Sequence, residues 1–175
     1  MPKNIVLTLT GRDKIGLVDG VTSLIVKRGG NVEASRMARL GGEFAMLMLV
    51  TVSDQEFSSL DADFQEMRSE GYQVTLLQTE DDSKKYLCWL PYEIEVTGAD
   101  HEGIIHDISH HLASKSINIE NMDTSSAPAP MSGTPLFMMK GIVLAPPHLN
   151  LHVLRDELEE IGDKLNVNVK VEMVK

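Results

Sequence analysis

Alternating apolar and polar residues indicate strands in both halves of the chain, and apolar residues spaced three and four apart indicate helices between them. In the first half, helical spacing begins at Leu17 and stops at the Gly29–Gly30 pair. The first half predicts strands over 4–10, 32–40, 44–52 and 72–77, and helices over 17–28 and 53–70. The second half predicts strands over 86–97, 117–125, 136–144 and 167–174, and helices over 103–115 and 151–165.

Each half therefore has the order strand, helix, strand, strand, helix, strand. This order is that of the ferredoxin-like βαββαβ unit, an antiparallel sheet with both helices on one face. We predict an α+β protein with two such units in tandem, the first over 1–80 and the second over 87–175, joined by a charged linker over 81–86. Glu56 follows Ser53 by three residues, which is typical of a capping box at a helix start.

One stretch of sequence occurs twice at a fixed offset of 87 residues. Thr10–Leu17 returns as Thr97–Ile104, and both copies have the pattern Thr-Gly-x-Asp-x-x-Gly followed by leucine or isoleucine. The same offset pairs Asn31 with Asn118 and Glu33 with Glu120. Such self-similarity indicates two copies of one structural unit. The second hairpin connection, 127–135, is about six residues longer than the first, because the offset grows to 93 beyond it.

The charge balance argues against direct binding to nucleic acid. The formal net charge is −10, and an acidic chain lacks the electrostatic attraction that dominates nucleic-acid affinity. The basic clustering of the first half consists of Lys27, Arg28, Arg36 and Arg39, and four scattered charges are more typical of a solvated face than of a DNA site.

Other features place the chain in the cytoplasm. The longest apolar run, 45–50, is far too short to span a bilayer, and no basic and apolar leader precedes the first strand, so we expect neither export nor a membrane partner. The single cysteine, Cys88, precludes a disulfide within the chain. Because Cys88 adjoins Trp89 in an apolar segment, we expect it to be buried.

With the two Asp-x-x-Gly loops and the βαββαβ order, the chain resembles ACT domains, which are small-molecule-sensing modules attached to many enzymes of amino-acid metabolism. Two such domains with nothing else resemble the glycine cleavage system transcriptional repressor family. The stretches that carry the resemblance are 10–17, 30–36 and 42–44. The first copy matches better than the second, where Ala99 replaces Arg12 and the hairpin is longer. The resemblance implies a ligand held at an interface between two domains.

The loops have the chemistry to bind a free amino acid. A helix N-terminus presents unpaired N–H groups to a carboxylate, and glycine lets a ligand approach the backbone closely. Asp13 and Asp100 could accept an ammonium group, although capping of the following helix explains these aspartates equally well. The candidate ligand-binding residues are Arg12, Asp13, Lys14, Ile15, Gly16, Leu17 and Asn31 in the first copy and Asp100, His101, Gly103, Ile104 and Asn118 in the second. If one copy alone binds a carboxylate, the cationic Arg12 and Lys14 favour the first.

Catalysis and metal binding find less support in the sequence. No nucleophile has an activating histidine and an orienting acid, and no phosphate-binding loop is present. His106 and His110 lie four apart beside His111, but no acidic third ligand accompanies them, so a solvated helix face explains them better. We therefore expect no cofactor, no metal and no enzymatic activity.

The favoured hypothesis is a non-catalytic regulator that senses an amino acid, with glycine as one possibility. It would regulate transcription of glycine cleavage through a protein partner, such as a DNA-bound activator, and would form a homo-oligomer. The alternative is a tandem ACT interaction or scaffold module that needs no ligand.

Overall fold

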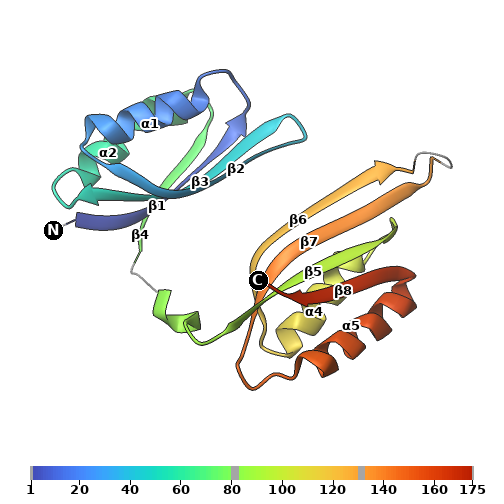
Figure 1. Cartoon of the computed structure of the whole chain (residues 1–175). Coiled ribbons are helices and arrows are strands. Elements are labelled where there is room, and N and C mark those ends of the chain that lie inside the picture. The colour runs from blue at the N-terminus through green and yellow to red at the C-terminus, as the bar shows by residue number, and fades with distance from the viewer. Residues whose placement is uncertain (1, 80–82, 130–132, 175) are drawn as a thin grey trace. The chain divides into compact units, whose positions relative to one another are not determined.

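The computed structural model describes residues 2–79, 83–129 and 133–174, and it divides the chain into two compact units, Met1–Asp82 and Ser83–Lys175 (Figure 1). Part of the predicted linker, 81–82, and part of the long hairpin connection, 130–132, lie outside the described residues. The rest of the predicted linker belongs to a 3₁₀ helix, η1 (Ser83–Tyr86), which opens the second unit.

The first unit is a four-stranded antiparallel sheet with helices packed on one face (Figure 1). The strand order is β2-β3-β1-β4, so the first strand lies between the third and the fourth. Its elements are β1 (Pro2–Arg12), α1 (Leu17–Lys27), β2 (Asn31–Leu40), β3 (Glu43–Ser53), α2 (Phe57–Asp63), α3 (Gln65–Ser69) and β4 (Gln73–Thr79).

The second unit repeats this topology with the strand order β6-β7-β5-β8. Its elements are β5 (Leu90–Ala99), α4 (Ile104–Ser114), β6 (Asn118–Pro128), β7 (Pro135–Ala145), α5 (Leu151–Leu165) and β8 (Val167–Met173). The prediction of two ferredoxin-like units is therefore confirmed. In the part of the chain that the structure describes, no helix has both the length and the apolar character needed to cross a bilayer.

Each unit has its own core between its sheet and its helices. Inward-facing side chains of alternate strand positions, such as Leu7 and Met48, pack against the apolar stripe of α1, where Val21 and Ile25 are fully buried. The equivalent packing in the second unit joins the sheet to Ile108 and Leu112 of α4 and to Leu154 and Leu158 of α5. Burial of these side chains from water is the main stabilising term in both units.

The prediction of one helix over 53–70 that starts with a capping box is wrong. Strand β3 runs through Ser53, α2 begins at Phe57, and Glu56 precedes it without a side-chain capping bond. The link between the two is a backbone hydrogen bond of 3.1 Å from the Glu56 amide to the Ser53 carbonyl. The helix is also interrupted at Phe64, which is fully buried. The apolar stripe continues through the interruption, which explains why periodicity did not reveal it.

The segment before β5 also differs from prediction. The strand begins at Leu90 and not at Tyr86, and the predicted burial of Cys88 is wrong because this side chain is exposed. The Trp89 amide donates to the Tyr86 carbonyl at 2.9 Å, and the two rings pack edge to face with their centroids 4.8 Å apart. The chain turns around this aromatic pair, which leaves Cys88 on the outside of the turn.

The repeated glutamates mark a β-bulge in each unit. The register of β2 against β3 shifts between Val32 and Ala34, so Glu33 is the extra residue. The register of β6 against β7 shifts at the equivalent place, which makes Glu120 the extra residue. This part of the repeat therefore has a structural cause.

Candidate functional site

Each unit places its Asp-x-x-Gly loop between the end of its first strand and the start of its first helix. The backbone fixes both loops to the neighbouring strand pair: the Asp13 amide donates to the Gly42 carbonyl at 3.5 Å, and the Asp100 amide donates to the Pro135 carbonyl at 2.9 Å. We call residues 12–17 the first loop and residues 99–104 the second loop. Leu17 and Ile104 are buried and anchor the loop ends in the two cores, whereas Ile15 is fully exposed.

Both helices begin without a side-chain cap. The residue before each helix is a glycine with positive φ, 85° at Gly16 and 98° at Gly103, a conformation that other residues adopt only with strain. Neither Asp13 nor Asp100 caps its helix, so the capping alternative is wrong. The first-turn N–H groups of α1 and α4 therefore lack a side-chain acceptor and keep their capacity to bind an anion.

The charged residues of the first loop are largely neutralised within the first unit. Asp13 pairs with Arg39 at 3.0 Å, and Lys14 pairs with Glu70 at 2.6 Å. The Lys14 ammonium also lies 5.1 Å from the centre of the Tyr72 ring. The hydrogen bond to Glu70 raises the pKa of Lys14 above its usual value. Lys14 is therefore held by Glu70 and Tyr72, two residues beyond the end of α3 that the repeat did not identify.

The second loop lines a pocket of about 510 Å³. The lining residues include the candidate residues Asp100, His101, Gly103 and Ile104 and three that the sequence did not suggest, namely Ile105, His106 and Phe137. Among the residues described, the Asp100 carboxylate makes no hydrogen bond or ion pair, and the Asp100 amide holds the loop to the Pro135 carbonyl.

His101 fastens the second loop to the end of α5. Its Nε2 lies 2.6 Å from the Leu165 carbonyl oxygen, and its Nδ1 lies 2.9 Å from the Glu102 carbonyl oxygen. Only the imidazolium form can donate from both nitrogens. The hydrogen bonds to the Glu102 and Leu165 carbonyls raise the pKa of His101 above its usual value, and Asp100 and Asp107 add to this effect.

The two asparagines do not join the loops within one unit. In the first sheet, Asn31 lies in the register row of Asn4 and Thr51, whereas Arg12 pairs with Glu43 at the other end. Arg12 lies eight positions along β1 from Asn4, which corresponds to about 26 Å. The Asn31 amide instead donates to Glu33 at 2.9 Å, and Thr51 donates to the same carboxylate at 3.0 Å. These bonds lower the pKa of Glu33.

Asn118 has the same remote position in the second unit. It pairs with Leu144 near the start of β5, whereas the second loop follows the end of β5, where Ala99 pairs with Leu136. The loop and the asparagine of one unit therefore lie too far apart to hold the same amino acid.

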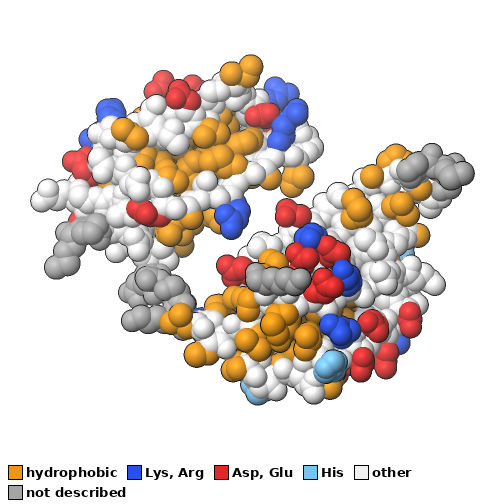
Figure 2. All heavy atoms as spheres, viewed as in Figure 1, with side chains coloured by type: hydrophobic (Ala, Val, Ile, Leu, Met, Phe, Trp, Pro, Cys, Tyr) orange, Lys and Arg blue, Asp and Glu red, His pale blue; other side chains and the backbone are white. Residues whose placement is uncertain are grey.

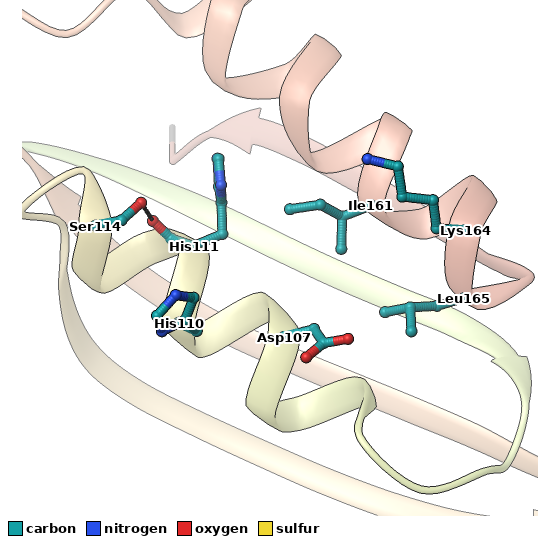
Figure 3. A pocket seen from close by; sticks show the side chains of 7 residues that line it. All are labelled: Asp107, His110, His111, Ser114, Ile161, Lys164 and Leu165. Atoms are coloured by element: carbon teal, nitrogen blue, oxygen red, sulfur yellow. Dashed lines mark hydrogen bonds between the residues drawn. The ribbon is translucent and has the colours of Figure 1, made fainter.

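A smaller groove of about 370 Å³ lies between α4 and α5 (Figure 3). Asp107 and His110 approach it from α4, and Ile161, Lys164 and Leu165 approach it from α5. His111 is also held by Glu157 of α5 at 3.1 Å. The rings of His106 and His110 stack 5.9 Å apart, and the described part of the chain holds no cluster of three or more residues suited to a metal ion.

Comparison with known proteins places this fold in a family. The family model of the ACT domain matches residues 3–75. The UPF0237 protein YjhC of Lactococcus lactis is 34% identical over 58 residues, which are 33% of this chain and 67% of the relative. A UPF0237 protein of Methanococcus maripaludis is 33% identical over 70 residues, which are 39% of this chain and 78% of the relative. The chain belongs to the ACT domain family.

Two solved structures cover both units of this ACT domain protein. A protein of unknown function from Galdieria sulphuraria is 30% identical, with full coverage of both chains and a TM-score of 0.87. A candidate glycine cleavage system transcriptional repressor is 20% identical, with coverage of 100% of this chain and 99% of its own, and a TM-score of 0.72. The second likeness establishes a shared fold, and the resemblance to a tandem ACT protein is confirmed.

Proposed function

We propose that this ACT domain protein is a non-catalytic regulator that senses a free amino acid. The observation that carries the proposal is the pocket at the second loop, which combines an uncapped helix start with the Asp100 carboxylate. Its volume of about 510 Å³ falls in the range of small-molecule sites.

The pocket lining offers a partner for each charged group of a free amino acid. The ligand carboxylate would accept hydrogen bonds from first-turn N–H groups of α4, which follow Gly103. The ligand ammonium would pair with Asp100, and its side chain would lie against Ile105 and Phe137. The imidazolium of His101 would add positive charge beside the carboxylate.

The first loop is retained as a second candidate. Arg12 is exposed, and the helix start after Gly16 is uncapped as in the second unit. Lys14 and Asp13 are already paired, so binding here would require a ligand to compete with Glu70 and Arg39. Asn31 and Asn118 would contribute only where two units meet, in line with an interfacial ACT ligand.

We further propose that the ligand state controls binding to another protein. A net charge of −10 disfavours direct contact with DNA, so a regulator of glycine cleavage would act on a protein partner, such as a DNA-bound activator. The shared fold with the candidate repressor supports this idea. Regulation requires that the ligand favour one conformation or assembly over another.

Isothermal titration calorimetry with each of the twenty amino acids, glycine first, tests the sensing function. We expect one amino acid to bind, and we expect Asp100→Asn to weaken that binding at least tenfold, since a hydrogen bond to a charged group contributes about 1.5–3 kcal/mol. Asp156→Asn is the matched control, because it removes the same charge from an exposed position on α5. If no amino acid binds at about millimolar concentration, near the weak end of specific affinities, sensing is refuted.

A ligand-independent scaffold is the alternative function. Exposed leucines on the sheet of the first unit, Leu47 and Leu77, favour it. Capture of a partner by the purified chain, repeated with and without the amino acids, separates the two functions. Capture that responds to one amino acid supports the sensor, whereas capture of equal strength in every condition supports the scaffold.

A further inference from the structure

The sheet of the first unit has an outer face that none of the described helices of that unit covers. Side chains of β3 alternate: Met46, Met48 and Val50 point into the core, so Leu47 and Leu49 point outward. The register sets Leu49 beside Val6 of β1, which is in turn beside Leu77 of β4. Leu47 and Leu77 are 47% and 67% exposed. We call this surface, centred on Val6, Leu47, Leu49 and Leu77, the apolar face.

Two hydroxyl groups at the centre of the apolar face are hydrogen-bonded to each other. Thr8 lies between Leu47 of β3 and Thr75 of β4, and the two threonine hydroxyls are hydrogen-bonded together. This bond supplies one donor and one acceptor of the pair, so burying the two hydroxyls together costs less than burying two unpaired hydroxyls.

Charged side chains lie only at the margin of this face among the residues described. Arg36 is beside Leu47 but on the edge strand β2, and Arg12 and Glu43 pair at one end of the sheet. Glu33 lies at the opposite end, where Thr51 of β3 donates to it. Two positive and two negative side chains thus surround an uncharged centre.

The same face of the second unit is charged, so the apolar face is not a requirement of the fold. There the central row runs Lys170, Glu95, Lys140 and Asp123 across the four strands. Lys140 bonds to Glu95 at 2.8 Å and to Glu93 at 3.0 Å. Figure 2 shows acidic and basic side chains intermixed over these strands. Two copies of one fold have therefore diverged on this surface.

We propose that two copies of the chain form a symmetric dimer in which their apolar faces pack against each other. A two-fold interface brings the same patch together from both copies, so the patch must complement itself. An uncharged centre with a balanced margin meets this condition, because neither copy presents net charge to the other. Facing sheets pack about 10 Å apart, as in a β-sandwich.

The available area is sufficient for such a dimer. Four strands spaced about 4.8 Å apart, each paired over about nine residues, cover about 570 Å² per copy. The two copies together would bury about 1,100 Å², which lies above the threshold of about 1,000 Å² for a biological interface and at the small end of the range. A reversible dimer with a dissociation constant in the micromolar range is expected, and it needs no bound amino acid.

Sedimentation velocity of the full chain over a range of concentrations tests this dimer. We expect Leu47→Glu to weaken dimerisation about a hundredfold, because each copy would bring a negative charge into the uncharged centre of the interface. Val26→Glu is the matched control, since Val26 is 71% exposed on α1 and lies on the other side of the unit. Circular dichroism checks that both variants fold, and Leu77→Glu replaces Leu47→Glu if that variant does not.

A charge-pairing experiment identifies the face. Leu47→Lys alone should also be monomeric, whereas an equal mixture of Leu47→Glu and Leu47→Lys chains should form a heterodimer. A wild-type chain that stays monomeric at about 100 µM overturns the proposal, because the face must then serve a different partner. A dimer that persists in Leu47→Glu, or that is lost in Val26→Glu alone, also overturns it.

Discussion

Replacing Gly98 by alanine would force apart two strands beside the second loop. Gly98 lies in β5, two residues before Asp100, and pairs with Val167 of β8 and Phe137 of β7. A Cβ atom at this position would lie 2.7 Å from Cγ1 of Val167, 2.9 Å from its Cα and 3.0 Å from the Asn166 carbonyl oxygen. Real carbon contacts are longer than this, so the neighbours must move.

The loss in free energy of unfolding depends on the atoms that the new methyl group contacts. Two of the three nearest atoms belong to the backbone, so no rotamer change of Val167 can relieve the clash. Overpacking of this kind costs about 1–3 kcal/mol, and we expect Gly98→Ala to lower the free energy of unfolding of the second unit by about 2 kcal/mol. The loop should be displaced with the strand end, so amino-acid binding at Asp100 should also weaken.

The assay uses the single tryptophan of the chain. Trp89 belongs to the second unit, so its fluorescence during urea unfolding is a probe of that unit. Ala99→Ser is the control at the next, exposed position, where we expect a change within about 0.5 kcal/mol. If Gly98→Ala also stays within about 0.5 kcal/mol of the wild type, the strands yield without strain and the reasoning is refuted.

Two further substitutions test the second unit. The pKa of His101 is raised by the folded structure, so the bonds of its imidazolium stabilise the fold fully below its unfolded pKa, about 6.5, and this stability is lost as pH rises through the higher folded value. His101→Gln should abolish that part of the pH dependence of the melting temperature, whereas the exposed His148→Gln should not. Ser116 has a φ of 58°, so Ser116→Gly should raise the free energy of unfolding, measured by urea titration, by about 0.5–1 kcal/mol; a loss of stability would contradict the assigned strain.

The order of elements could be predicted because core-facing residues recur in the sequence at the spacing of helices and strands. The α5 prediction over 151–165 agrees with the structure, since its apolar stripe is regular and Asn150 caps its start. Periodicity fails as a predictor where apolar residues pack on each other outside the core of a unit. Tyr86 and Trp89 pack on each other in a turn. In the sequence, an apolar turn of this length cannot be told from the start of a strand.

The candidate site could be predicted only in part. The repeat identified Gly16 and Gly103, because a left-handed residue before a helix restricts that position to glycine. It could not identify Phe137 or Leu165, which reach the second loop from other elements and have no fixed spacing from it. It also grouped Asn31 with the first loop, although only the strand register reveals that the two lie at opposite ends of the sheet.

The two units keep one backbone and differ in where their charges are used. In the first unit, Glu70 and Arg39 already neutralise Lys14 and Asp13 of the loop, and the outer sheet face is apolar. In the second unit, the pocket at Asp100 is open and the outer face has the charged row around Lys140. A duplicated domain under selection for two tasks would diverge in this way, with assembly assigned to the first copy and ligand binding to the second. The substitutions Leu47→Glu and Asp100→Asn should therefore affect dimerisation and amino-acid binding separately, and a common effect of either one on both would argue for a single shared task.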